Sequence, residues 1–273
     1  MNSPRKETLE IVSRLPAGEA QPTPLLFVHG AFTAAWCWDE HFLAWFAAQG
    51  YAAHAVSLSG HGHSPGRERL DSLAIDDYVA DVAAAVATLP APPVLIGHSM
   101  GGFVVQRYLE RHAAPAALLM CSVPPQGLMG SAFSMMFSKP ALMQDLNGIM
   151  AGGMASLESL RDALFAQEIS VEDLTRFLRL AQPESHRAMW DMMMFALPSP
   201  AQVLKGVANR RERLLLLGAE LDHLIPPSAV DMTARSYGVG SHIFPAMGHG
   251  LMLERDWQLV AQRVLQWLKE NQL

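Results

Sequence analysis

A serine between two glycines is the first candidate for chemistry in this chain. The segment Gly-His-Ser-Met-Gly at 97–101 follows an apolar run at 94–96 and precedes a helical pattern over 100–111. A serine on a sharp strand-to-helix turn exposes its hydroxyl above the sheet, and the helix points its positive N-terminal end toward charge that develops nearby. We therefore predict Ser99 as a nucleophile; the alternative is a glycine-rich turn that carries a chemically idle serine.

The elements that must position this serine are visible as short apolar runs bounded by glycine, proline or polar residues. Such runs are typical of strands buried on both faces of a parallel sheet. Residues 8–15 alternate instead, which favours an antiparallel edge strand. Helical patterns, among them 75–89 and 257–268, lie between the runs, so the chain alternates strand and helix as in βαβ units. The six runs are 25–28, 53–58, 94–96, 116–121, 214–217 and 242–244.

The alternation stops between 121 and 213. Residues 126–200 hold ten of the sixteen methionines, and the only charges in 126–157 are Lys139 and Asp145. A segment of this length is too long for a simple loop. We predict a helical cap (lid) insertion over the sheet at 126–200, with 1–125 and 201–273 forming the core domain.

Composition narrows the class of protein. Half of the 273 residues are hydrophobic and 17% are charged, which predicts a folded domain. A net charge of -6 argues against non-specific nucleic-acid binding.

No apolar run of about 18 residues and no apolar leader occur, so we expect no transmembrane segment and a cytoplasmic protein. The two cysteines are expected to be reduced. No zinc spacing and no phosphate-binding loop appear, so no metal and no cofactor are expected.

On the turn at 97–101 and its flanking strand and helix, the sequence resembles the α/β-hydrolase family. The resemblance covers nearly the whole chain outside the insertion. It implies an α/β-hydrolase fold, a mostly parallel sheet flanked by helices, with the chain order serine, acid, histidine. The segment Gly-Ala-Glu-Leu-Asp at 218–222 resembles the family's acid turn and implies Asp222, with Glu220 as the rival. The Gly-His turn before the C-terminal helix implies His249 as general base.

The family's other glycine-rich turns carry further expectations. An oxyanion hole needs two backbone N–H groups; the resemblance implies Met100, directly after the nucleophile, and Ala31 in the His-Gly-Ala-Phe turn, with Phe32 as the near alternative. The histidines expected to bond nearby backbone in such turns are His29, His61, His63 and His98.

The resemblance implies a serine hydrolase that cleaves a carboxylic ester through an acyl-enzyme. The apolar insertion favours an apolar or amphipathic acyl substrate, because ligand pockets are mostly hydrophobic. The turn at 58–64 resembles lysophospholipase-like and monoacylglycerol-lipase-like members, although it is shared too widely to select a substrate. The candidate substrate-binding residues are Phe32, Met135, Met136 and Met193.

Several alternatives stay open at this point. Thioesterases, amidases and C–C bond hydrolases use the same three residues, and a non-catalytic ligand-binding protein can share the fold. The expected partner is a small-molecule ester or acyl compound. The oligomeric state is not determined by the sequence, and a homodimer is one of the open outcomes.

Overall fold

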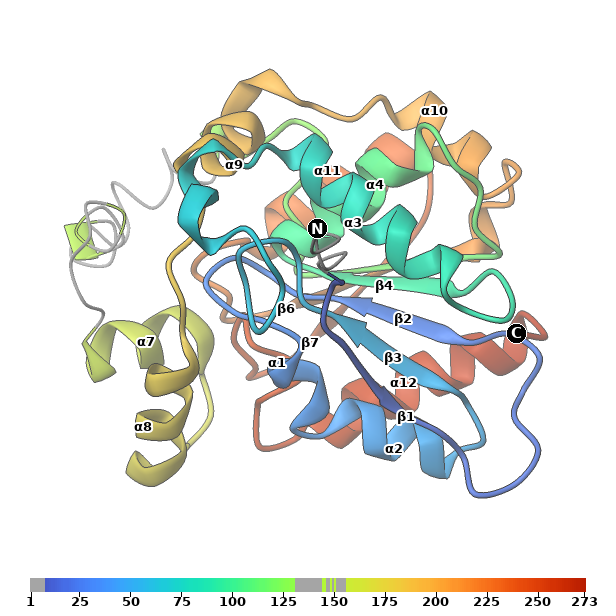
Figure 1. Cartoon of the computed structure of the whole chain (residues 1–273), viewed down its shortest axis with the longest axis horizontal. Helices are drawn as coiled ribbons and strands as arrows, with labels where there is room; N and C mark the ends of the chain where they lie inside the picture. Colours follow the sequence, from blue (N-terminus) through green and yellow to red (C-terminus); the bar gives the residue numbers. More distant parts are fainter. Residues whose placement is uncertain (1–7, 131–143, 146–147, 149, 151–155) are drawn as a thin grey trace, which may run out of the picture.

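The computed structural model describes residues 8–130, 144–145, 148, 150 and 156–273. These residues contain a seven-stranded sheet in the order β1-β3-β2-β4-β5-β6-β7 (Figure 1). β1 is antiparallel to β3 at one edge, and every other pair is parallel. The predicted parallel sheet and its antiparallel edge strand are therefore confirmed. The strands are β1 (Ile11–Arg14), β2 (Leu25–Val28), β3 (Ala53–Val56), β4 (Val94–His98), β5 (Ala117–Met120), β6 (Leu214–Ala219) and β7 (Ser241–Phe244).

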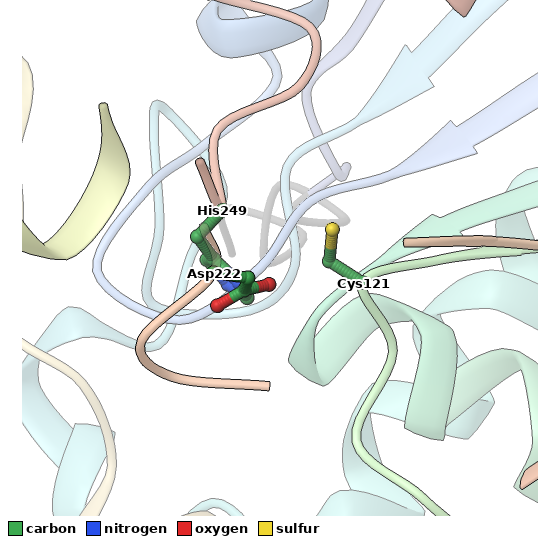
Figure 2. A group of neighbouring side chains, drawn as sticks. All are labelled: Cys121, Asp222 and His249. Carbon is green, nitrogen blue, oxygen red and sulfur yellow. The ribbon is translucent and has the colours of Figure 1, made fainter. Parts of the chain in front are cut away.

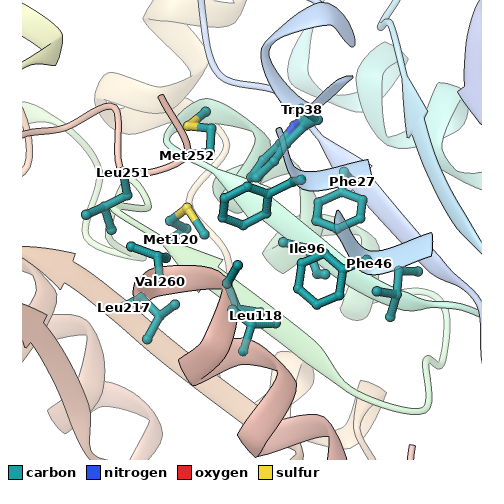
Figure 3. Close-up of a cluster of buried hydrophobic side chains, with 14 of the residues drawn as sticks. Phe27, Trp38, Phe46, Ile96, Leu118, Met120, Leu217, Leu251, Met252 and Val260 are labelled. Atoms are coloured by element: carbon teal, nitrogen blue, oxygen red, sulfur yellow. The ribbon is translucent and has the colours of Figure 1, made fainter. Parts of the chain in front are cut away.

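The central strands are continuous apolar runs because both faces of the sheet are covered. Successive side chains of a strand point to opposite faces, so Phe27 joins one core cluster while its neighbour Leu26 joins the other. Figure 3 shows the first cluster, in which Phe27, Trp38 and Phe46 pack together beside strand residues such as Leu118. Two buried faces give each central strand a fixed register and leave only the strand ends open for chemistry.

Helices supply the cover on each face. Side chains of α2 and α12 enter the first core cluster, and side chains of α3, α4 and α11 enter the second. The predicted helices at 75–89, 100–111 and 257–268 correspond to α3, α4 and α12. The helices of the described chain are α1 (Trp36–Asp39), α2 (Phe42–Ala48), α3 (Ile75–Ala87), α4 (Met100–Leu109), α7 (Leu157–Leu164), α8 (Val171–Leu180), α9 (His186–Trp190), α10 (Pro200–Gly206), α11 (Pro227–Tyr237) and α12 (Trp257–Glu270), with short 3-10 helices at Arg67–Ser72 and Arg211–Arg213 and a π-helical turn at Asp191–Phe195.

The described part of the predicted insertion is helical. In Figure 1, α7, α8 and α9 lie on the side toward which the arrowheads of β2 and β3 point. Arg176 of α8 binds the Glu40 carboxylate of the core through two contacts of 2.6 and 2.7 Å. α10 packs on α4, with Gly206 against Leu109, so the chain has rejoined the core there. The cap boundaries at 126 and 200 stay a prediction. No helix of the described residues is long and apolar enough to cross a membrane.

We predict that Gly101→Ala destabilises the protein by about 3 kcal/mol, the upper range for overpacking a tight contact. A Cβ at Gly101 would overlap the backbone carbonyl oxygens of Val28 and His29, which cannot move without disturbing β2. Chemical denaturation measures the loss. Gly240→Ala is the matched control, because a Cβ there has no neighbour within 4 Å. Equal unfolding midpoints for the two variants would contradict the close packing of α4 on β2.

Candidate functional site

Ser99 occupies the turn between β4 and α4 with a left-handed backbone. Its φ of 51° and ψ of -118° lie outside the regions that non-glycine residues prefer. Strained residues of this kind persist only where the surroundings hold them. Here the Ser99 N–H donates to the Met120 carbonyl (3.0 Å), and the Ser99 carbonyl accepts from the N–H of Gly102 (3.1 Å) and Val123 (3.2 Å). The turn therefore lifts the half-buried Ser99 side chain above the ends of the parallel strands.

The flanking glycines are required by close packing. A Cβ at Gly97 would lie 2.5 Å from the Gly101 carbonyl oxygen. A Cβ at Gly30 would lie 3.0 Å from the Ser99 Cβ and 2.9 Å from His98 Nδ1. The turn after β2 therefore passes directly beside the serine.

Asp222 and His249 form a buried hydrogen-bonded pair beyond the ends of β6 and β7 (Figure 2). His249 Nδ1 lies 2.7 Å from Asp222 Oδ2. Asp222 Oδ1 accepts the N–H groups of Leu224 and Ile225, both at 2.8 Å. Because the carboxylate only accepts, Nδ1 carries the proton, and Nε2 of a neutral imidazole is left as the basic atom.

Glu220, the rival acid, has a different neighbour. Its Oε2 accepts the Ala246 N–H (2.8 Å) at the surface of the loop that follows β7. Of the two carboxylates, the structure brings Asp222 to His249 and leaves Glu220 as a support of that loop.

The loop that carries His249 is held from two sides. The His249 backbone carbonyl accepts from His98 Nε2 at 2.9 Å, and His98 directly precedes Ser99. The buried Glu254 accepts the N–H groups of Gly248 (2.7 Å) and, from the segment after α7, Ala166 (2.7 Å). Among the hydrogen bonds of the described residues, none joins the Ser99 hydroxyl to His249; the His98 bond is what links the two turns.

The expectation for the four turn histidines is partly wrong. His29 and His61 do bond nearby backbone, at Gly30 and Ser59. His98 instead reaches across 151 positions to His249, and the His63 side chain is 92% exposed. Sequence spacing cannot distinguish these cases, because the partners of His98 and His63 depend on which loops meet.

Cys121 lies beside the pair in Figure 2 and is the only other group there that could bind a metal among the described residues. Ligand atoms of Cys121, Asp222 and His249 lie within 4.8 Å of one another. Burial, and then the Asp222 charge, raise the pKa of the Cys121 thiol well above its usual value. A metal needs the thiolate, and the other two groups already bind each other. The donor set therefore fits a hydrogen-bonded pair beside a protonated thiol better than a metal site.

Backbone N–H groups close to Ser99 are available to an anion. Within the described residues, the N–H groups of Ala31, Phe32 and Met100 have no hydrogen-bond acceptor. The Met100 N–H is at the N-terminus of α4, where the helix has no acceptor of its own. The carbonyl of Gly30, on the same peptide as the Ala31 N–H, accepts from His29 Nδ1 (2.8 Å) and Thr33 Oγ1 (3.0 Å). These two bonds fix the plane of the peptide that carries the Ala31 donor.

The predicted substrate-binding residues are only partly visible. Phe32 is half-buried with a φ of 63°, and Met193 is half-buried in the π-helical turn. Met135 and Met136 lie outside the described residues. The sequence analysis missed Glu254 and Glu184, two buried carboxylates that tie the insertion to the site, since nothing in their local sequence marks them as buried.

Comparisons with known proteins place most of the chain in one family. Residues 25–263 match the family model described as the alpha/beta hydrolase family. A non-heme haloperoxidase of Rhodococcus erythropolis is 38% identical over 37% of this chain and 38% of its own length. A pimeloyl-[acyl-carrier protein] methyl ester esterase of Chromobacterium violaceum is 26% identical over 78% of this chain and 61% of its own length. The chain thus matches less than two thirds of either relative.

A solved structure resembles nearly the whole chain. The monoacylglycerol lipase of Paleococcus ferrophilus superposes with a TM-score of 0.66 at 17% identity, covering 96% of this chain and 99% of that structure. At this identity the likeness concerns the fold.

Proposed function

Because the chain belongs to the alpha/beta hydrolase family, we propose that it is a serine hydrolase that cleaves a carboxylic ester of an apolar or amphipathic acyl compound. The observation that carries the proposal is the Ser99 turn, with its φ of 51° and with N–H groups on both sides that have no acceptor within the described part of the chain. A protein that only binds ligands has no need to hold a serine in a strained backbone beside two anion donors. The named activity of the Chromobacterium relative on a methyl ester supports an ester as the substrate class.

In the proposed mechanism, His249 Nε2 removes the Ser99 proton as the oxygen attacks the ester carbonyl. Asp222 orients the imidazole and stabilises the imidazolium that forms. The N–H groups of Ala31 and Met100 stabilise the negative oxygen of the tetrahedral intermediate. The imidazolium then gives its proton to the departing alcohol, and water activated in the same way hydrolyses the acyl-enzyme.

The insertion is proposed as the cap that binds the acyl chain. Its described helices lie at the carboxyl ends of the strands (Figure 1), where open α/β sheets bind ligands. The Leu164 carbonyl of α7 accepts the Gly250 N–H at 2.7 Å, so the cap reaches the residue after His249.

We predict that Ser99→Ala abolishes ester turnover and fluorophosphonate labelling while the protein stays folded. The substitution removes only a hydroxyl from a half-buried side chain, so the unfolding midpoint should stay close to that of the wild type. Turnover of p-nitrophenyl acetate, labelling and circular dichroism are measured on the same preparation. Wild-type turnover in folded Ser99→Ala would refute the proposal.

Parallel assays with thioester, amide and C–C substrates decide among the alternative reactions of the same residues.

We predict that Asp222→Asn lowers kcat by roughly 10³- to 10⁴-fold, because an amide cannot hold the imidazole in the same tautomer. Glu220→Gln is the control: its carboxylate is two residues away and bonds only the Ala246 backbone. Steady-state kinetics at saturating ester give kcat for both variants. The reverse order of effects would assign the acid to Glu220.

We predict that Met193→Gln lowers kcat/KM for long acyl esters more than for acetate esters. The difference should be roughly fourfold for each methylene that loses apolar contact, which corresponds to about 0.8 kcal/mol. Met194→Gln is the matched control, because Met194 is 47% exposed. An equal loss for acetate and octanoate esters, together with a lowered Tm, would show that Met193 only stabilises the cap.

A further inference from the structure

A buried carboxylate from the insertion lies outside the mechanism just described. Glu184 follows α8, and its side chain has no exposed surface. Its Oε1 accepts from the Tyr78 hydroxyl and the Ser185 N–H, both at 2.7 Å. Its Oε2 lies 3.1 Å from His61 Nε2, which is also fully buried. A buried carboxylate is strongly destabilising unless a partner compensates its charge, so the protonation of His61 decides how this group is tolerated.

The surroundings of His61 favour its protonated form. Its Nδ1 lies 3.0 Å from the Ser59 carbonyl, which can only accept, so Nδ1 carries a proton. Its Nε2 faces a carboxylate, and an unprotonated Nε2 would place its lone pair against that negative charge. Burial alone would lower the pKa of His61, but the negative charge of the adjacent Glu184 carboxylate and the bond to the Ser59 carbonyl together outweigh burial and raise it. Burial likewise opposes ionisation of Glu184, and His61 holds its pKa below the usual value.

The pair reaches the proposed oxyanion hole through His29. The rings of His61 and His29 lie 5.2 Å apart. Burial and the neighbouring His61 lower the pKa of His29 to about 3, so His29 is neutral. Its Nε2 accepts the Leu58 N–H (3.0 Å), which leaves its single proton on Nδ1, bonded to the Gly30 carbonyl (2.8 Å). That carbonyl belongs to the peptide whose N–H, on Ala31, is the proposed oxyanion donor.

A second contact from the same segment holds the other end of this turn. The Gln182 N–H donates to the Phe32 carbonyl at 2.9 Å, and Gln182 Oε1 accepts the N–H of Gly62 at 2.8 Å. Gly62 is adjacent to His61. The segment 182–185 therefore bonds the oxyanion turn directly at Phe32 and indirectly through His61 and His29.

We propose that Glu184 is a positioning residue for ester hydrolysis: its ion pair with His61 holds His29, and thereby the Gly30–Ala31 peptide, in the orientation that stabilises the tetrahedral intermediate. This inference rests on the proposed function of Ser99. Glu184 touches no reacting atom, and it acts only through the direction of one backbone N–H. Because the oxyanion forms in the transition state, weakening this support lowers kcat and leaves KM almost unchanged.

The test is Glu184→Gln, which keeps the shape of the side chain and removes its charge. We expect kcat for p-nitrophenyl acetate to fall about tenfold with KM within about twofold, less than the roughly 10²- to 10³-fold loss from deleting an oxyanion donor. Arg176→Gln is the matched control: it breaks the ion pair between α8 and Glu40, which also joins insertion to core but does not contact the turn. Its kcat should stay within about twofold of the wild type.

Tyr78→Phe removes one donor to Glu184 without removing a charge, and it should lower kcat by about threefold at unchanged KM. It serves as the second variant if Glu184→Gln does not fold. Wild-type kcat in Glu184→Gln or in Tyr78→Phe overturns the inference, as does an equal loss in Arg176→Gln. Turnover that persists in Ser99→Ala overturns the proposed function instead, so the two failures are distinguishable.

Discussion

The left-handed backbone of Ser99 depends on how closely α4 packs against the end of β2. Gly101 lies against the Val28 and His29 carbonyls, and no side chain fits between them. Gly97 allows the first turn of the helix to fold back on its own strand. Hydrogen bonds from the neighbouring strand β5 and its loop then hold the serine in a conformation that a free chain would leave. The hydroxyl, the helix N-terminus and the turn at Gly30 meet at one point because of this packing.

Three buried carboxylates, Asp222, Glu254 and Glu184, are each stabilised by different contacts. Asp222 is held by two backbone N–H groups and the His249 imidazole. Glu254 accepts backbone N–H groups from two loops, and burial raises its pKa. Glu184 accepts from the Tyr78 hydroxyl and the Ser185 N–H, and its second oxygen lies 3.1 Å from His61 Nε2. Buried polar groups are expensive unless every lone pair has a partner, so these contacts make the loops around Ser99 mutually dependent.

Glu254 and Glu184 also connect the predicted insertion to the core, one carboxylate from each side of the boundary. Glu254 belongs to the core and binds the backbone after α7, next to the turn that carries His249. Glu184 belongs to the insertion and binds His61 beside the turn that carries Ala31. The turns that carry His249 and Ala31 are thus each held by a separate contact with the predicted insertion. These two side chains therefore connect the predicted insertion with the loops that carry His249 and His61.

The sequence by itself determined the elements and the local turns, because their signals are short-range. Apolar runs predicted a sheet buried on both faces, and glycines around Ser99 and before His249 marked turns that only small residues permit. The sequence left both Asp222 and Glu220 as candidates for the acid that pairs with the histidine, since both follow the same strand by a few residues. Only the tertiary structure decided that Asp222 faces His249, that His98 bonds the His249 backbone, and that Glu184 meets His61. Each of these contacts joins segments far apart in the chain, and their partners are chosen by which strand ends and loops pack together, which periodicity does not encode.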